Sequence, residues 1–162
     1  MQRKTKKLVY IALLSAVAIV LHMVESMLSL PLPLGVKLGL ANIISLVVIE
    51  LYGPRELIFV NFLRVMISHL IIGQFMSYMF FISCGGVLLS TLAIIICKRW
   101  FPIVSLSIIS AIFHSIGQLI VVSFVVSSIA LLPYIFLMFV LSIPTGIFTG
   151  LVAGEIIKRI QI

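Results

Sequence analysis

Several polar side chains of this 162-residue chain lie inside long apolar segments, where each needs a physical reason to be present. Some share one face of a helix by their spacing: His22 and Glu25 are three residues apart, and His114 and Gln118 are four apart. The set comprises His22, Glu25, Lys37, Asn42, Arg64, His69, Gln74, His114 and Gln118, with Glu50 and Asn61 elsewhere. Side chains of these types can bind a small charged molecule, so we treat the set as the candidate site.

The cationic members of the set indicate an anionic ligand. Lys37, Arg64 and a histidine could together meet an anionic group, while the apolar walls hold the rest of the molecule. His69 ranks lower, because it lies about 140° from Arg64 around an ideal helix. The predicted substrate-binding residues are His22, Glu25, Lys37, Asn42, Arg64, His114 and Gln118.

A purely structural role is the alternative for each of these residues. Arg64 could pair with Glu25 or Glu50, Lys37 could extend to the outer lipid head groups, and the histidines could connect helices through hydrogen bonds. Convergence of polar groups at a similar depth on four predicted helices favours ligand binding for the cluster as a whole.

The residues that catalysis would need are missing from the sequence. The chain contains no aspartate, and its four acids are Glu25, Glu50, Glu56 and Glu155. No carboxylate pair is placed for magnesium-diphosphate chemistry, and there is no phosphate-binding Gly-rich loop, nucleophile elbow or metal-binding histidine pair. We therefore expect no catalytic residue, no metal and no cofactor, and any ATP hydrolysis would come from other subunits.

The composition is that of an integral membrane protein. Hydrophobic residues make up 63% of the chain and charged residues 9%, against roughly 25% charged residues in soluble domains. The apolar runs reach the length of about 20 residues that a helix needs to cross a bilayer. We predict an all-α bundle of six transmembrane helices, at residues 8–26, 36–53, 56–73, 75–97, 101–127 and 130–157.

Basic residues set the predicted orientation. The net charge of +7 would suggest nucleic acid in a soluble protein, but the cations gather at helix ends, in the N-terminal segment, at Arg55, at Lys98-Arg99 and at Lys158-Arg159. The positive-inside rule then places both termini in the cytoplasm of a multi-pass cell-membrane protein, and most of the polar set falls between the middle and the outer face. We expect a basic segment at 1–7, one transmembrane domain at 8–162, and an outer cap at residues 26–35.

Small residues mark two further helix faces. Ala12 and Ala16 lie on a side of the first helix that differs from the His22 side, and Gly146, Gly150 and Gly154 follow at four-residue spacing in the last helix. Such stripes let helices approach closely. Packing within the bundle is the default interpretation of both.

Four segments resemble a known family: GVKLGLANI at Gly35–Ile43, NFLRVMISHLIIGQF at Asn61–Phe75, SCGGVLLS at Ser83–Ser90 and HSIGQL at His114–Leu119. They are similar to the Gx transporter family, also called the heptaprenyl diphosphate synthase component I family. Its general shape is similar to the substrate-binding S-components of energy-coupling factor transporters. The resemblance covers nearly the whole chain beyond the basic segment.

The resemblance implies a six-helix bundle that captures a small molecule from outside and docks on a transmembrane coupling protein bound to two ATPases. It makes Ala12 and Ala16 candidate partner contacts. The leading hypothesis is therefore a transport subunit for a small, partly anionic and partly apolar metabolite. The alternative is a non-catalytic membrane component that assists a soluble prenyl diphosphate synthase, and a third possibility is a bundle whose polar residues only connect helices.

Overall fold

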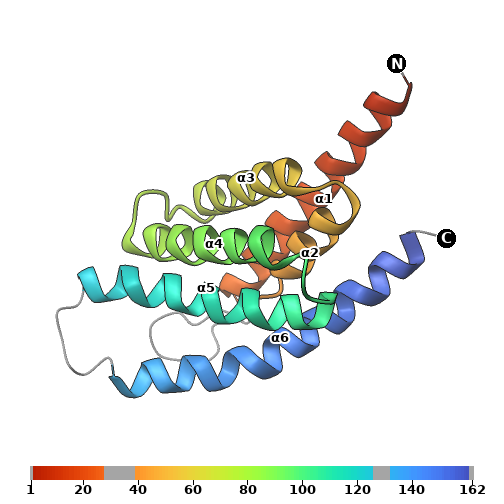
Figure 1. Cartoon of the computed structure of the whole chain (residues 1–162). Coiled ribbons are helices and arrows are strands. Elements are labelled where there is room, and N and C mark those ends of the chain that lie inside the picture. Colours follow the sequence, from red (N-terminus) through yellow and green to blue (C-terminus); the bar gives the residue numbers. More distant parts are fainter. Residues whose placement is uncertain (1, 28–38, 126–131, 161–162) are drawn as a thin grey trace.

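The computed structural model describes residues 2–27, 39–125 and 132–160, and these ranges fold into six α-helices (Figure 1). The prediction of an all-α fold with six helices is confirmed. The helices are α1 (Gln2–Met27), α2 (Asn42–Leu51), α3 (Pro54–Ile72), α4 (Tyr78–Cys97), α5 (Ile103–Val125) and α6 (Leu132–Ile160).

Four of the helices are long and apolar enough to cross a membrane. They contain the segments Lys4–Met27, Tyr78–Cys97, Ile103–Phe124 and Phe136–Ile160. Their outward faces carry large apolar side chains such as Leu13, Phe124 and Phe148, which water would not solvate well. The chain is therefore a multi-pass membrane protein.

Six membrane-spanning helices were predicted, but the four such helices among the described residues include neither α2 nor α3, which was expected to span at 56–73. The larger difference is at α2. A span was expected at residues 36–53, but the helix occupies only Asn42–Leu51, ten residues or about 15 Å, roughly half of a bilayer core. Gly39, at a φ of 80°, turns the chain just before it, and Gly53-Pro54 ends it. Residues 36–38 of the expected span lie outside the described ranges.

The short helix α2 lies in the middle of the bundle (Figure 1). Its residues from Asn42 to Ile49 are all buried, and Leu46, Val47 and Val48 have no exposed surface. A helix that is apolar on every side needs other helices around it. The hydrophobic core of the protein is accordingly built around α2, with Ala18 of α1, Leu57 of α3 and Ile94 of α4 packed against it.

Glycines bring α4, α5 and α6 into close contact. A Cβ atom added to Gly117 of α5 would lie 2.2 Å from the carbonyl oxygen of Gly85 in α4, and one added to Gly146 of α6 would lie 2.7 Å from the Cα of Ile108 in α5. A Cβ atom added to Gly150 would lie 2.9 Å from the Cα of Val104. Two glycines of the stripe in the last helix, Gly146 and Gly150, therefore serve close internal packing, as the default interpretation expected, whereas Gly154 has only an ordinary contact with Ile103 at 3.5 Å.

The basic segments gather at one end of the bundle. Both chain ends and the turns after α2 and α4 lie there in Figure 1. Lys7 of α1 forms an ion pair with Glu56 of α3 at 2.5 Å, and the Lys98 Nζ donates to the carbonyl oxygen of Ile49 at 2.6 Å. This common location is the geometry that the positive-inside argument assumed.

Candidate functional site

A small polar cavity lies where five helices meet. Polar side chains reach it from α1, α3, α4 and α5, and the turn into α2 completes it. Its volume is about 10 Å³, close to the minimum that one water molecule needs. Its lining residues are His22, Glu25, Gly39, Ala41, Asn42, Arg64, Ser83 and His114. The structure thus brings five of the predicted binding residues to one place.

Arg64 is the most deeply buried charged side chain of this cavity, with 1% of its surface exposed. Its Nη1 donates to Asn42 Oδ1 at 3.4 Å and to Ser45 Oγ at 3.5 Å, which are both long for hydrogen bonds. Its Nε has no hydrogen-bond partner among the described residues. A guanidinium carries five N–H donors, so most of its hydrogen-bonding capacity is not used by strong contacts within the described chain.

Of the two carboxylates suggested for pairing with Arg64, Glu50 is engaged elsewhere, and Glu25 attracts the guanidinium through its charge. Glu50 instead faces Lys98, with 3.6 Å between its Oε2 and the Lys98 Nζ. Glu25 lines the same cavity as Arg64, but the ion pairs between described residues do not include these two. The structural alternative of an Arg64–Glu50 pair is therefore wrong.

The turn before α2 positions Glu25. The Glu25 Oε1 accepts a hydrogen bond from the backbone N–H of Gly39, a residue with a φ of 80°. Side chains rarely tolerate this left-handed conformation, so glycine is the suitable residue there. The turn also starts α2, since Asn42 N–H donates to Gly39 O at 2.8 Å. One glycine thus links the Glu25 carboxylate to the end of α2 that carries Asn42.

Gly86 of α4 leaves room for the predicted pair on α5. A Cβ atom at Gly86 would lie 2.8 Å from Gln118 Cγ and 2.9 Å from His114 Cε1. His114 lines the cavity, whereas Gln118 packs beside it and does not. The Gln118 Nε2 is buried without a hydrogen-bond partner in the described part of the chain. The spacing of four residues therefore placed the pair on one buried face, but only His114 at the cavity.

His69 is closer to the predicted set than its helical phase suggested. It is 1% exposed, its ring centroid lies 5.2 Å from that of His22, and its Nδ1 lies 2.9 Å from Val65 O. The low rank assumed that only one narrow face of this helix points inward. In fact α1 packs beside α3, so a wider stripe is buried. The spacing of four residues from Val65 to His69 is the sequence pattern that would have indicated this.

A hydrogen-bonded chain extends from Arg64 across the bundle. Ser45 Oγ, which accepts from Arg64, donates to Asn61 Oδ1 at 2.7 Å, and Asn61 Nδ2 donates to Thr91 Oγ1 at 2.8 Å. This series of hydrogen bonds joins α2, α3 and α4. The sequence interpretation noted Asn61 but missed Ser45 and Thr91, because hydroxyl groups inside apolar helices usually bond to their own backbone.

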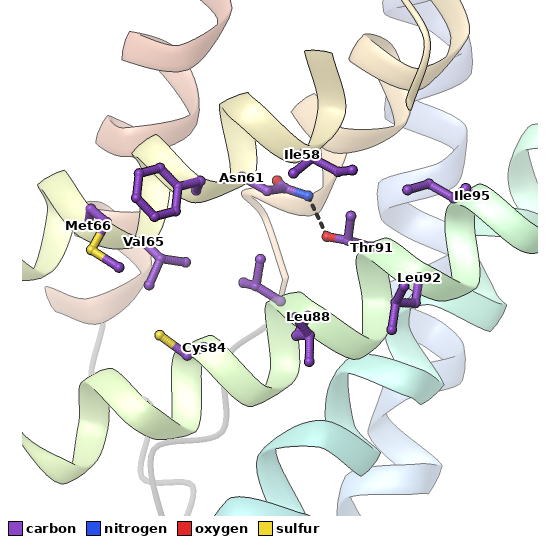
Figure 2. A pocket seen from close by; sticks show the side chains of 11 residues that line it. Ile58, Asn61, Val65, Met66, Cys84, Leu88, Thr91, Leu92 and Ile95 are labelled. Atoms are coloured by element: carbon purple, nitrogen blue, oxygen red, sulfur yellow. Dashed lines mark hydrogen bonds between the residues drawn. The ribbon is translucent and has the colours of Figure 1, made fainter. Parts of the chain in front are cut away.

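Asn61 and Thr91 also reach a groove between α3 and α4. The groove has a volume of about 310 Å³ (Figure 2). Its other walls are almost wholly apolar: Ile58 and Val65 come from α3, and Leu88 from α4. Figure 2 shows the Asn61–Thr91 hydrogen bond at this groove, with Met66 and Cys84 at the other end. The polar network of the core therefore ends at a lipid-compatible surface.

The remaining predicted residues divide between the surface and the undescribed part. Lys37 lies outside the described ranges, and so do residues 28–35 of the expected outer cap at 26–35. Ala12 and Ala16 are exposed on α1, while Ala18 is buried in the core. The two alanines are thus available for contact. Within residues 2–27, 39–125 and 132–160, no three His, Cys, Asp or Glu side chains are grouped so as to hold a metal ion.

A protein-family model described as heptaprenyl diphosphate synthase component I matches residues 14–156. The chain belongs to this family. The matched region contains every predicted substrate-binding residue, from His22 to Gln118, and the family assignment made from the four sequence segments is confirmed. No curated protein and no solved structure matches the chain. The architecture described above is thus a helical membrane fold of the heptaprenyl diphosphate synthase component I family.

Proposed function

We propose that this chain is the substrate-binding subunit of an energy-coupling factor type transporter, and that it binds a small, partly anionic and partly apolar molecule from the outer side. The observation that carries the proposal is Arg64. This side chain is 1% exposed and has no ion pair within 4 Å in the described chain. It lies at a cavity with His22, Asn42 and His114, and with the Glu25 carboxylate, which balances part of its charge. A charge kept at such cost inside a membrane protein supports a functional role.

The chemistry of Arg64 supports an anionic group on the ligand. A guanidinium presents its donors as a planar fork that matches carboxylate and phosphate oxygens. The Asn42 and His114 side chains add groups that can hydrogen-bond to such an anion. The apolar helices around the cavity would then hold the rest of the molecule.

Ligand binding requires the cavity to widen. Its volume of about 10 Å³ is far below the roughly 300–1,000 Å³ of small-molecule sites. The proposal therefore requires helices to separate around Arg64 when the ligand binds. A cavity of this size also suits the structural alternative, in which the polar residues only connect helices, so the experiment must distinguish the two.

The proposed transporter has a defined orientation and defined partners. The basic end of the bundle faces the cytoplasm by the positive-inside rule. Exposed Ala12 and Ala16 would contact a transmembrane coupling subunit that is bound to two ATPases. The chain itself would have no enzymatic activity, because it lacks the carboxylates that diphosphate chemistry requires.

Native mass spectrometry of the gently extracted full chain tests the proposal, because it detects retained small molecules and partner subunits together. The molecule that it identifies is then used in uptake assays with and without coexpressed coupling subunits. Arg64→Gln should abolish retention and uptake, and Arg99→Gln, an exposed arginine at the basic end, should change neither. Binding that is unchanged in a chain with both Arg64→Ala and His114→Ala would contradict the site.

A second candidate function rests on the family description. A heptaprenyl diphosphate synthase component could be a membrane accessory protein that recruits a soluble prenyl diphosphate synthase through the turns at Arg55 and Lys98. An isoprenoid diphosphate has the anionic head and apolar tail that the first proposal also describes. Copurification with such a synthase and without coupling ATPases would favour this function, and the reverse result would exclude it.

A further inference from the structure

A second concave surface lies between α1 and α3 at the basic end of the bundle. It has a volume of about 630 Å³. Both helices run inward from this end, so early residues of each form its charged part and later residues its apolar part. Lys4, Lys7 and Arg55 supply the cations, with Glu56 as the one acid. Ile11, Phe59 and Leu63 continue the groove along α1 and α3, away from the basic end of the bundle.

The charges of this groove do not cancel. The Lys7 Nζ lies 2.5 Å from Glu56 Oε1, so this pair joins the two helices and neutralises itself. Lys4 and Arg55 take part in no ion pair between described residues, and both are exposed. Two uncompensated cations therefore lie at one end of an apolar groove.

We propose that this groove binds an anionic phospholipid, with its phosphate at Lys4 and Arg55 and one acyl chain along Ile11, Phe59 and Leu63. Basic pockets between membrane helices recognise anionic head groups in this way. The charged side chains of the groove lie at one end and its apolar side chains at the other, which matches the charged head group and apolar acyl chain of a phospholipid. The small side chains of Ala12 and Ser15 give the groove its depth on the α1 side.

A lipid fits this groove better than a helix of a partner protein. The volume of about 630 Å³ is within the roughly 300–1,000 Å³ of small-molecule sites. A helix with its side chains is about 10–12 Å across and would need a broader surface. A bound lipid would cover Ala12 and leave Ala16, which does not line the groove, exposed, so a coupling subunit that contacts both alanines would have to displace the lipid. The lipid site itself does not depend on the transporter proposal.

Lipid titration followed by native mass spectrometry tests the site on the full-length chain in detergent. Phosphatidylglycerol and phosphatidylcholine with the same acyl chains are compared, and phosphatidylglycerol should bind more tightly. Each surface cation contributes about fivefold, so Lys4→Gln with Arg55→Gln should weaken phosphatidylglycerol binding by about 25-fold. Lys158→Gln with Arg159→Gln removes the same formal charge near the end of α6 and should change it less than about twofold.

A third variant tests the apolar part. Ala12→Phe fills the groove at an exposed position, and should weaken the binding of both lipids while helical circular dichroism stays unchanged. If Lys4→Gln with Arg55→Gln and Lys158→Gln with Arg159→Gln weakened phosphatidylglycerol binding equally, overall charge would explain the effect, and the site would be overturned. Equal affinity for both lipids in the wild-type chain would overturn it as well, as would a copurified protein that occupies the groove in place of lipid.

Discussion

Arg64 combines a permanent charge, near-complete burial and the lack of an ion pair within the described chain. Buried charges are normally paired, because desolvation otherwise costs several kcal/mol, on the order of a domain's whole stability. Two long hydrogen bonds, to Asn42 and Ser45, and attraction to the Glu25 carboxylate in the same cavity offset only part of that cost. A residue kept under these conditions is a poor contributor to stability and a good candidate for function.

This reasoning predicts opposite effects of one substitution on stability and on binding. Arg64→Met keeps most of the side-chain volume and removes the buried charge, so the free energy of unfolding should stay equal or rise by about 1–4 kcal/mol. Ligand retention should be lost. Thermal unfolding in detergent and native mass spectrometry measure the two effects.

Leu57→Ala is the matched control in the same helix. Leu57 is fully buried in the core around α2, so its truncation should lower the free energy of unfolding by about 2–5 kcal/mol. An Arg64→Met variant that is as unstable as Leu57→Ala would show that Arg64 mainly supports the fold, in agreement with the structural alternative.

Gly39 and Gly73 form a second matched pair at this scale. Both have positive φ, 80° and 75°, so an alanine at either position should cost about 1–2 kcal/mol in unfolding free energy. Only at Gly39 would the new Cβ also meet a site residue, at 3.3 Å from Asn42 Nδ2, and Gly73 has open space around it. Gly39→Ala should weaken ligand binding and Gly73→Ala should not. If the two variants bound the ligand equally well, the turn at Gly39 would have no role in ligand binding.

The site residues could be predicted from sequence to the extent that they are costly in a membrane. Charge and polarity inside apolar segments identified His22, Glu25, Arg64 and His114, which line one cavity. Helical phase did not predict that His69 is buried near His22, because the phase of a residue does not show how many other helices pack around its helix. It also could not place Gln118 outside the cavity, since that depends on where α4 leaves room at Gly86.

At the scale of the helices, close packing of α4 on α5 predicts a graded response to glycine substitution. Gly117→Ala places a Cβ 2.2 Å from the backbone oxygen of Gly85, so the two helices must separate, and the free energy of unfolding should fall by about 1–3 kcal/mol. Gly154→Ala in α6 meets only Ile103 at 3.5 Å and should be neutral or stabilising, because alanine favours helix. Thermal unfolding in detergent compares them, and equal destabilisation would contradict the packing.

Helix ends were predictable where glycine or proline interrupts an apolar run. The chain turns at Gly53-Pro54 and after Ile72, where Gly73 adopts the left-handed conformation. The length of α2 was not predictable, because apolar residues continue on both sides of Asn42 and composition does not distinguish a buried helix from a membrane-spanning one. The four helices that are long and apolar enough to cross a membrane overlap the predicted spans at 8–26, 75–97, 101–127 and 130–157.

At the scale of the whole molecule, the clustering of basic segments predicts which positions can be labelled from each side of the membrane. In a chain with Cys84 and Cys97 replaced by serine, a cysteine introduced at Arg99 or at Arg159 should react with a membrane-impermeant thiol reagent from the cytoplasmic side. A cysteine at Met76, which is 63% exposed in the turn between α3 and α4, should react only from the outside. Labelling of Met76→Cys and Arg99→Cys from the same side would reverse the topology and remove the outward-facing site.

The enclosed position of α2 has a consequence for how the protein is made. A helix of ten residues is too short to be inserted into the bilayer as a unit, since spanning takes about 20. Its apolar surroundings consist of α3, α4, α5 and α6 as well as α1, and most of these are synthesised later. During translation α2 is therefore enclosed only after these later helices have been inserted, and the Arg64 cavity, which begins at its first turn, is completed when α5 supplies His114.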